Sequence, residues 1–594
     1  MSIILAIGLF YPLLAGLWEK APLDSNIDCI QAEKIATDEV VSEQFKLLQE
    51  EIKDPRTRCA TAHNLGLTRN KLAAKMLEDA IVSEKDENVL LESMISIWNL
   101  REIRKPSRIE FYRENMASEV PIKRTYSRLL FIAAGGSQEE LFKSLETESY
   151  DFSADMAWNE LFLSAKAADC AKARPFLKSP LLANRRGAAK FIGTKEQNEK
   201  ALDEDFKIIE QDHPSVAISF AEGIITGKNK AGIAILDKLS SSPIVPVRST
   251  IATAQIQDQR MEKILIRLSS DKDCEIRRLS CVSLGAFKTD SSIETLISSL
   301  RDIDFYVRTA SEDSLIKLNP DKAFIKRIAD LLNDSVARNS AIKILGELNH
   351  KEYSEKIFKF IADDSDTETL RRAIRALDIF NLKKSSAKIA AFSEHKDDEV
   401  RVAVASALGT FNDPSTYSAL RKLDKDKVNK VRLEAIKAIG RTKTDSFADI
   451  LEQNLKEYTS APEIRAYAAW AVAKTGSCNN NIGNALEKII SQEIIPMEAG
   501  RRTYDALFSR TSAFWALMVL GNKNSTFQAK GKAILKKYRE NPPGDDLSGE
   551  SLEQMLYYFD QAVCYVEGRK VQQKEVPVII LNDISPVNKI KNQK

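Results

Sequence analysis

Three segments of the chain read almost alike although they lie far apart. Residues 397–409 read DDEVRVAVASALG, residues 273–285 read DCEIRRLSCVSLG, and residues 334–346 read DSVARNSAIKILG. A motif that returns many times means that each unit buries its apolar face only against the next unit. This repetition constrains the fold more than any other feature of the sequence.

The arginine of the motif recurs at a nearly constant interval. Successive steps are 31, 30, 33, 30, 31 and 33 residues along the series Arg277, Arg308, Arg338, Arg371, Arg401, Arg432 and Arg465. Weaker copies continue the register upstream through Arg248, Ala217 and Arg186. A related copy at Arg58 lies nearer the N-terminus, and a late, longer copy at Arg510 follows Arg465. A period near 31 residues predicts an all-α protein, namely an α-solenoid of stacked helical hairpins.

Each unit reads as two helices. The second helix is expected to begin at an Asp that caps free amides, such as Asp273 or Asp397. Apolar residues then recur at spacings of three and four, as in Val400, Ala403, Val404 and Ala407. Glycine follows, and we expect it to end the helix in the left-handed conformation. These glycines are Gly285, Gly346, Gly409 and Gly440.

The copies of the form D-x-x-V-R-x-x-A-x-x-A-L-G resemble HEAT-like repeats, in particular the short variety found in phycobilisome-lyase-type proteins. The resemblance is strong over residues 248–476 and looser over about 50–520. It implies an α-solenoid, a curved right-handed superhelix whose inner surface holds proteins.

The repeat also divides the chain. We expect a signal-like or anchor-like apolar segment at 1–23, the solenoid at 24–537, and a linker, capping helix and extended tail at 538–594. Within the last part, 551–568 reads as one amphipathic helix and 575–583 (EVPVIILND) as a β-prone run. That run is expected to lie back on the solenoid or to pair with the sheet edge of a partner.

The first eighteen residues, MSIILAIGLFYPLLAGLW, are apolar until Glu19. This length suits the core of a signal peptide, and it predicts export or membrane tethering through residues 3–18, in the periplasm or envelope of a bacterium. Leu17 stands where a lipoprotein signal would need Cys. The alternative is a buried first helix in a cytoplasmic protein.

Composition argues against several classes of function. The 87 basic and 85 acidic side chains leave a net charge of +2, so we expect no nucleic-acid partner. The seven cysteines include no CxxC pair. The four histidines form no HExxH motif and no His-Glu dyad of the deoxyhypusine hydroxylase kind. No catalytic, cofactor-binding or metal-binding residue is predicted, and the sequence leans against an enzyme.

The repeated arginines are interpreted as framework, because a residue at the period of the fold can hydrogen-bond to the adjacent unit. Binding residues should depart from that register. Our candidates for partner binding, whose alternative is a solvated helix face, are Arg278, Arg372, Arg375, Lys437 and Arg441. The aromatic residues near the end of the array are expected in the core, with a partner anchor as the alternative. They are Tyr467, Trp470, Phe514 and Trp515.

Two functions remain open. The first is a non-catalytic protein–protein interaction scaffold that uses the concave face of the solenoid. The alternative is a HEAT-like lyase or chaperone-type protein that acts on a partner protein. The sequence does not identify the partner.

Overall fold

The computed structural model describes residues 38–49, 54–164, 166–457, 461–491, 507–540 and 549–567. The predicted N-terminal segment (1–23) and the β-prone run (575–583) lie outside these ranges. The described residues form helices joined by turns, with no strand among them. The prediction of an all-α α-solenoid is therefore confirmed.

The chain divides into two compact units, residues 1–264 and 265–594, with the division inside α17 (Gln259–Leu268). The solenoid predicted over 24–537 includes residues of both units. The helices of unit 1 are α3 (Asp38–Gln49), α4 (Pro55–Leu67), α5 (Lys71–Ala80), α6 (Glu87–Asn99), α7 (Ile109–Asn115), α8 (Pro121–Ala133), α9 (Gln138–Leu145), α10 (Asp151–Ser164), α11 (Cys170–Ala173), α12 (Leu182–Lys195), α13 (Glu199–Ile209), α14 (Pro214–Thr226), α15 (Ile233–Leu239) and α16 (Val245–Ala252).

Unit 2 continues the same alternation of helices. They are α18 (Cys274–Leu284), α19 (Asp290–Ser299), α20 (Phe305–Leu318), α21 (Lys322–Asp330), α22 (Arg338–Glu347), α23 (Ser354–Phe358), α24 (Thr367–Ile379), α25 (Ser386–Ala390), α26 (Asp398–Phe411), α27 (Tyr417–Leu423), α28 (Asn429–Thr442), α29 (Ala448–Lys456), α30 (Pro462–Thr475), α31 (Asn480–Ser491), α32 (Leu507–Leu520), α33 (Ser525–Glu540) and α34 (Gly549–Val566).

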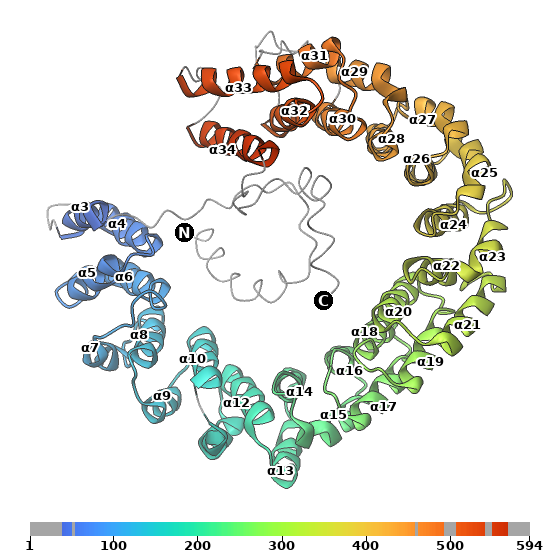
Figure 1. The fold of residues 1–594 in the computed structure, drawn as a ribbon. Coiled ribbons are helices and arrows are strands. Elements are labelled where there is room, and N and C mark those ends of the chain that lie inside the picture. The colour runs from blue at the N-terminus through green and yellow to red at the C-terminus, as the bar shows by residue number, and fades with distance from the viewer. Residues whose placement is uncertain are drawn as a thin grey trace. The chain divides into compact units, whose positions relative to one another are not determined.

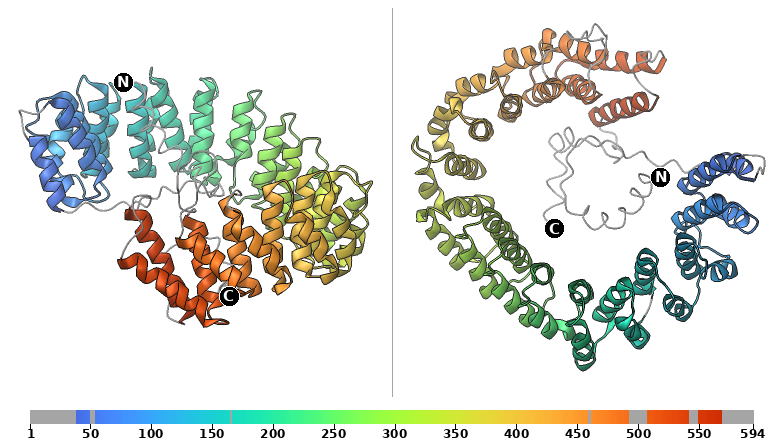
Figure 2. Two further views of the ribbon diagram at one scale, coloured as in Figure 1. Left: turned by 90° about the horizontal axis from the view of Figure 1, so that it is seen from above. Right: turned by 180° about the vertical axis from the view of Figure 1, so that it is seen from behind.

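The helices of unit 2 form two rows. The even-numbered helices from α18 to α32 pack on one another as the inner row of a curved stack, and the odd-numbered helices lie outside them (Figure 1). The further views show the same side-by-side stacking of hairpins (Figure 2). Because each hairpin is sealed by its neighbours, residues at one register position lie at equivalent places along the stack.

The expected helix starts are observed. Asp273 accepts hydrogen bonds from the amides of Glu275 and Ile276, and Asp397 accepts one from the amide of Val400. These carboxylates satisfy N–H groups that have no partner within the helix. Helices α18 and α26 consequently begin where their copies of the motif begin, whereas α22 begins at Arg338, four residues after Asp334.

The glycine of each motif has a different role from the one predicted. Among the described glycines, Gly135 and Gly476 have positive φ, and α26 runs through Gly409 to Phe411. A Cβ on Gly409 would lie 2.5 Å from Cα of Ala438, on α28. The prediction of a left-handed helix end was wrong because the glycine serves close contact between neighbouring inner helices.

The left-handed turn comes three residues later in the motif. Asn412 has φ 48° after Gly409, and Asn349 has φ 57° after Gly346. Asparagine tolerates this conformation better than other non-glycine residues. The sequence motif thus separates two functions, close helix packing and helix termination, that we had assigned to one residue.

The last helix closes the stack of unit 2. α34 packs against α32 and α33, and the rings of Phe514 and Phe559 stack with centroids 3.9 Å apart. A terminal helix of this kind covers apolar surface that has no further repeat to bury it. The helix expected at 551–568 therefore lies where a cap is needed.

Candidate protein-binding surface

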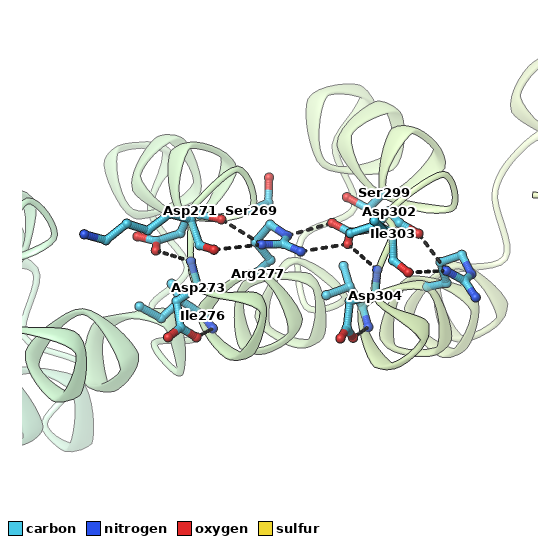
Figure 3. Close-up of polar contacts among 12 residues, drawn as sticks. Ser269, Asp271, Asp273, Ile276, Arg277, Ser299, Asp302, Ile303 and Asp304 are labelled. Atoms are coloured by element: carbon cyan, nitrogen blue, oxygen red, sulfur yellow. Dashed lines mark hydrogen bonds and ion pairs between the residues drawn. The ribbon is translucent and has the colours of Figure 1, made fainter. Parts of the chain in front are cut away.

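The arginines of the repeat bind backbone and carboxylate groups at the turns between helices. Arg277 donates to the carbonyl of Asp271 at 3.0 Å and to both carboxylate oxygens of Asp302 at 2.7 and 2.8 Å. The carbonyl of Asp302 in turn accepts from Arg308 at 2.7 Å (Figure 3). One aspartate therefore links the arginines of two successive units.

The same arrangement returns at Arg401, four units after Arg277. Arg401 donates to the carbonyl of His395 at 2.8 Å and to the carboxylate of Asp426 at 2.6 and 3.0 Å. Burial alone would raise the pKa of Asp426, but hydrogen bonds from Arg401 and from the amide of Val428 lower it. We call this series of contacts the arginine ladder.

Not every position of the ladder reaches a carboxylate of the next unit. Arg432 does so at Glu457, at 2.7 Å, 25 residues along the chain, as Arg277 and Arg401 do. Arg371 instead binds Glu368 on its own helix, and Arg338 donates to the carbonyl of Leu332 and faces the ring of Phe360. Arg465 donates to the carbonyl of Glu457 at 3.1 Å.

In unit 1, Arg248 keeps the predicted register and donates to the carbonyl of Ser242 at 2.8 Å. On α12 the ladder position is Arg185, one residue before the Arg186 that the sequence register suggested. Arg185 donates to the carbonyl of Ser179 and to the carboxylate of Asp212, the pattern of Arg277. Arg186 binds Asp155 on α10 instead. The register slipped because two adjacent arginines fit the motif equally well.

Arg124 extends the ladder to a position that sequence reasoning missed. It donates to the carbonyl of Ser118 and, together with the buried Arg128, to Glu148. Burial would raise the pKa of Glu148, but the two guanidinium groups lower it well below its ordinary value. These residues hold the hairpins together and leave the inner face to other side chains.

Asp424, next to the ladder in unit 2, carries a buried carboxyl group that accepts from Asn454 at 2.7 Å. Burial raises its pKa to about 6. The folded state then binds a proton more tightly than the unfolded state, so stability falls as pH rises through the interval from about 4 to 6.

We expect Asp424→Asn, which keeps the acceptor oxygen for Asn454, to stabilise the protein by about 1–3 kcal/mol at pH 7.5. The gain should shrink as pH is lowered to 5. Thermal unfolding of both proteins across this range measures it. A difference that does not change with pH would contradict the burial of an ionisable group here.

Four of the five candidate binding residues have partners within the chain. Arg278 binds Glu275 on its own helix at 2.6 and 2.7 Å. Lys437 lies 4.4 Å from the ring centroid of Tyr467. Arg441 donates to Glu434 at 2.8 Å.

The fourth of these, Arg372, belongs to a buried ionic network. It donates to Glu312 at 2.9 Å and to the carbonyl of Asn339 at 3.0 Å, so it joins α24 to both preceding inner helices. Lys343 lies 3.0 Å from the other oxygen of Glu312. Burial opposes the charge of Arg372, but Glu312 and Glu368 raise its pKa. This arginine is therefore occupied with joining repeats.

Arg375 differs from the other four candidates. It is exposed, and it makes no hydrogen bond or ion pair with any residue in the described part of the chain. It stands four residues after the ladder arginine, a position that is buried in the neighbouring inner helices. The equivalent residues there are Cys281, Glu312, Ile342, Ala405 and Ile436.

A pocket of about 190 Å³ opens between α22 and α24 at this departure from the repeat. We call it the α22–α24 pocket. Its walls include Ile342, Lys343, Arg371, Arg372, Arg375 and Ile379. Two of the predicted binding residues, Arg372 and Arg375, are thus brought together at one site, whereas Arg278, Lys437 and Arg441 are not among its walls.

Sequence reasoning missed a group of exposed apolar side chains at the N-terminal ends of α20 and α22. Their exposed fractions are 92% for Ile303, 53% for Phe305, 67% for Tyr306 and 48% for Val336. We call these four residues the apolar ridge. Comparison of the repeats could have found it. Tyr306 and Val336 stand two residues before their ladder arginines, where the repeats of Arg277 and Arg401 have Glu275 and Glu399.

The C-terminal aromatic residues lie mostly in the core. Trp470, Phe514 and Trp515 are buried, and a Cβ on Gly440 would lie 2.3 Å from the ring of Trp470. Tyr467 is half-buried beneath Lys437. Core packing, the first of the two alternatives, therefore accounts for the three buried residues.

Two kinds of feature are absent from the described ranges. Three or more His, Cys, Asp or Glu side chains do not gather there as a metal site would require. No helix of these ranges combines the length and apolar character needed to cross a membrane. The predicted anchor at 3–18 lies outside them.

Comparisons with known proteins agree with the geometry of the stack. The family described as HEAT repeats matches residues 229–316 and 386–473. The search of curated proteins finds no match. The protein is thus an α-solenoid that contains HEAT repeats.

Several solved structures are similar to this chain over most of its length. Kap121p bound to Ste12p is 11% identical, with a TM-score of 0.48 over 90% of this chain. The Kap95:Nup1 complex is 11% identical, with a TM-score of 0.45 over 89% of this chain and 84% of that one. Importin beta is 11% identical, with a TM-score of 0.42 over 89% of this chain and 74% of that one. This chain covers 66% of the Kap121p chain, just under two thirds of its length.

Proposed function

We propose that the protein is a non-catalytic scaffold that binds another protein through the inner row of unit 2 and the apolar ridge at its edge. The apolar ridge is the observation that carries this proposal. Side chains that are exposed singly need no explanation, but four in two successive repeats form a patch of the kind that marks protein interfaces. Aromatic residues are enriched in such interfaces.

The arrangement of the ridge suits a protein partner. The rings of Phe305 and Tyr306 lie edge to face with centroids 5.5 Å apart. Tyr306, on α20, and Val336, in the turn before α22, occupy the same register position of successive repeats. Neighbouring inner helices pack at about 8–10 Å. The ridge is therefore a surface that several side chains of a partner could cover together, while the arginine ladder holds the helices beneath it.

A variant of the ridge tests the scaffold. Ile303→Asp combined with Tyr306→Asp places two charges in the patch, and the high exposure of both residues means that folding should be unaffected. We expect at least a tenfold loss of partner protein in quantitative affinity purification from the native cell, because central apolar contacts dominate interface energy.

Unit 1 offers a matched control. Leu67 and Val82 are also exposed apolar residues, at 61% and 57%, and their double replacement by Asp should leave recovery unchanged. Equal recovery of the same proteins by the wild type and the ridge variant would refute the role of the ridge.

The location of the scaffold is a separate part of the proposal. The apolar residues 3–18 support export to, or tethering at, a bacterial cell envelope. Fractionation of cells that express the full chain, beside a chain that starts at Asp24, tests this. Identical soluble distribution of the two proteins would end the envelope proposal without affecting the scaffold. The resemblance to phycobilisome-lyase-type repeats rests on the sequence motif alone.

A further inference from the structure

We propose that the α22–α24 pocket binds a carboxylate of the partner protein, with Arg375 as its ligand and Ile379 as the contact for a neighbouring aliphatic side chain. The proposal rests on the scaffold function, and it adds the chemistry of the bound segment. The ridge and the pocket are independent observations, because they share no residue.

The charges around the pocket single out Arg375. Arg371 and Arg372 are bound to Glu368, and Arg372 also to Glu312. Lys343 lies between Glu312 and Asp313, at 3.0 and 2.8 Å. The wall cations other than Arg375 are thus neutralised within the chain.

Arg375 offers a planar group of donors that fits a carboxylate with two parallel hydrogen bonds. The equivalent side chains of neighbouring inner helices are buried, whereas Arg375 is exposed. Its exposure and lack of a partner in the described ranges leave the guanidinium available for a ligand.

The rest of the wall is already ordered. The side chain of Arg372 is 12% exposed and is held by three acceptors on three inner helices. Binding therefore requires ordering of little more than Arg375 itself, which lowers the entropic cost of association. The exposed Glu347 on the opposite wall can accept an amide N–H of the bound segment.

The apolar part of the site follows from the helix. Ile379 lies four residues after Arg375, one turn along the same face, and is 43% exposed. A volume of about 190 Å³ is smaller than the 300–1,000 Å³ typical of cofactor and small-molecule sites. The pocket has room for a carboxylate and an aliphatic side chain, as in an acidic residue followed by Leu, Ile or Val.

Display of random dodecapeptides against the purified full chain tests this assignment. We expect the enriched peptides to carry Asp or Glu next to an aliphatic residue. Arg375→Gln should weaken their binding by about 10- to 100-fold, the range for a hydrogen bond to a charged group. Arg375→Glu should select peptides with Lys or Arg at the acidic position.

The outer row supplies a matched control. Arg327 on α21 pairs with Glu294 at 2.7 Å, and Arg327→Gln should bind the selected peptides as the wild type does. Circular dichroism of all variants should be unchanged, because Arg375 makes no hydrogen bond or ion pair within the described ranges.

Three results would overturn the assignment: no enriched peptide, enriched peptides without an acidic residue, or binding that survives Arg375→Gln. None of them bears on the scaffold itself, because the affinity purification with the ridge variant uses neither the pocket nor a peptide. Conversely, if the affinity purification refuted the role of the ridge, the peptide display would still show whether the pocket binds an acidic peptide.

Discussion

Replacement of Arg401 by Met is expected to weaken the stack around α26 and α28 by about 2–4 kcal/mol. The side chains of Arg401 and Asp426 are only 8% and 10% exposed. Loss of the guanidinium leaves a nearly buried carboxylate and two backbone carbonyls without their donor. A charge that is stranded in this way costs more than the intact pair contributes.

The measurement has to be local, because long repeat arrays do not unfold in one cooperative step. Amide hydrogen exchange of peptides from α26 and α28 reports the free energy of opening there. Asp426→Asn in the same chain completes a double-mutant cycle, and the double variant should recover part of the loss.

Arg371→Met is the matched control. Arg371 occupies the same register position, but its carboxylate partner is Glu368 on its own helix, and both side chains are partly exposed at 22% and 38%. Pairs of this kind contribute about 0.5 kcal/mol or less. Equal losses for Arg401→Met and Arg371→Met would show that the link between units does not stabilise the stack.

Gly409→Val is expected to destabilise the contact between α26 and α28 by about 2–4 kcal/mol. A Cβ at this position would lie 2.5 Å from Cα and 3.0 Å from the carbonyl oxygen of Ala438. These are backbone atoms, so the two helices must move apart. The better intrinsic helix propensity of valine offsets only a small part of the loss.

A graded series checks the mechanism. Gly409→Ala should cost less than Gly409→Val, and Thr410→Ala, at the adjacent half-buried residue, should change stability by about 0.5 kcal/mol or less. The midpoint of thermal unfolding and the exchange of α28 amides measure all three variants. Stabilisation by Gly409→Ala would mean that helix propensity, and not close packing, governs this position.

The periodic part of the structure could be predicted from the sequence, because its cause is local. Spacing of the arginines near 31 residues predicted the solenoid, and Asp273 and Asp397 predicted the helix starts. An acidic residue stands 25 positions after Arg277, Arg401 and Arg432. The residue 25 positions after Arg371 is Lys396, so the sequence already distinguishes this arginine from the other three. A careful comparison of the copies would also have found the apolar residues of the ridge.

Other features depended on distances that no motif carries. The packing role of Gly409 is visible only once Ala438 of α28 is placed against it. That Arg185 and not Arg186 occupies the ladder position is visible only from the turn residues that its side chain reaches. The five candidate cations looked equivalent in sequence, yet Arg372 is enclosed by Glu312 from 60 residues away and Arg375 is free within the described ranges.

The sequence by itself determined that this protein is an array of helical hairpins, because repeated side chains can be buried only by repeated neighbours. Which surface residues remain available for a partner was decided by the tertiary structure alone. Whether a surface residue is open to a partner depends on charged groups and backbone atoms that different repeats bring close in space. At the α22–α24 pocket it also depends on Arg375, which is exposed where the equivalent residues of neighbouring repeats are buried.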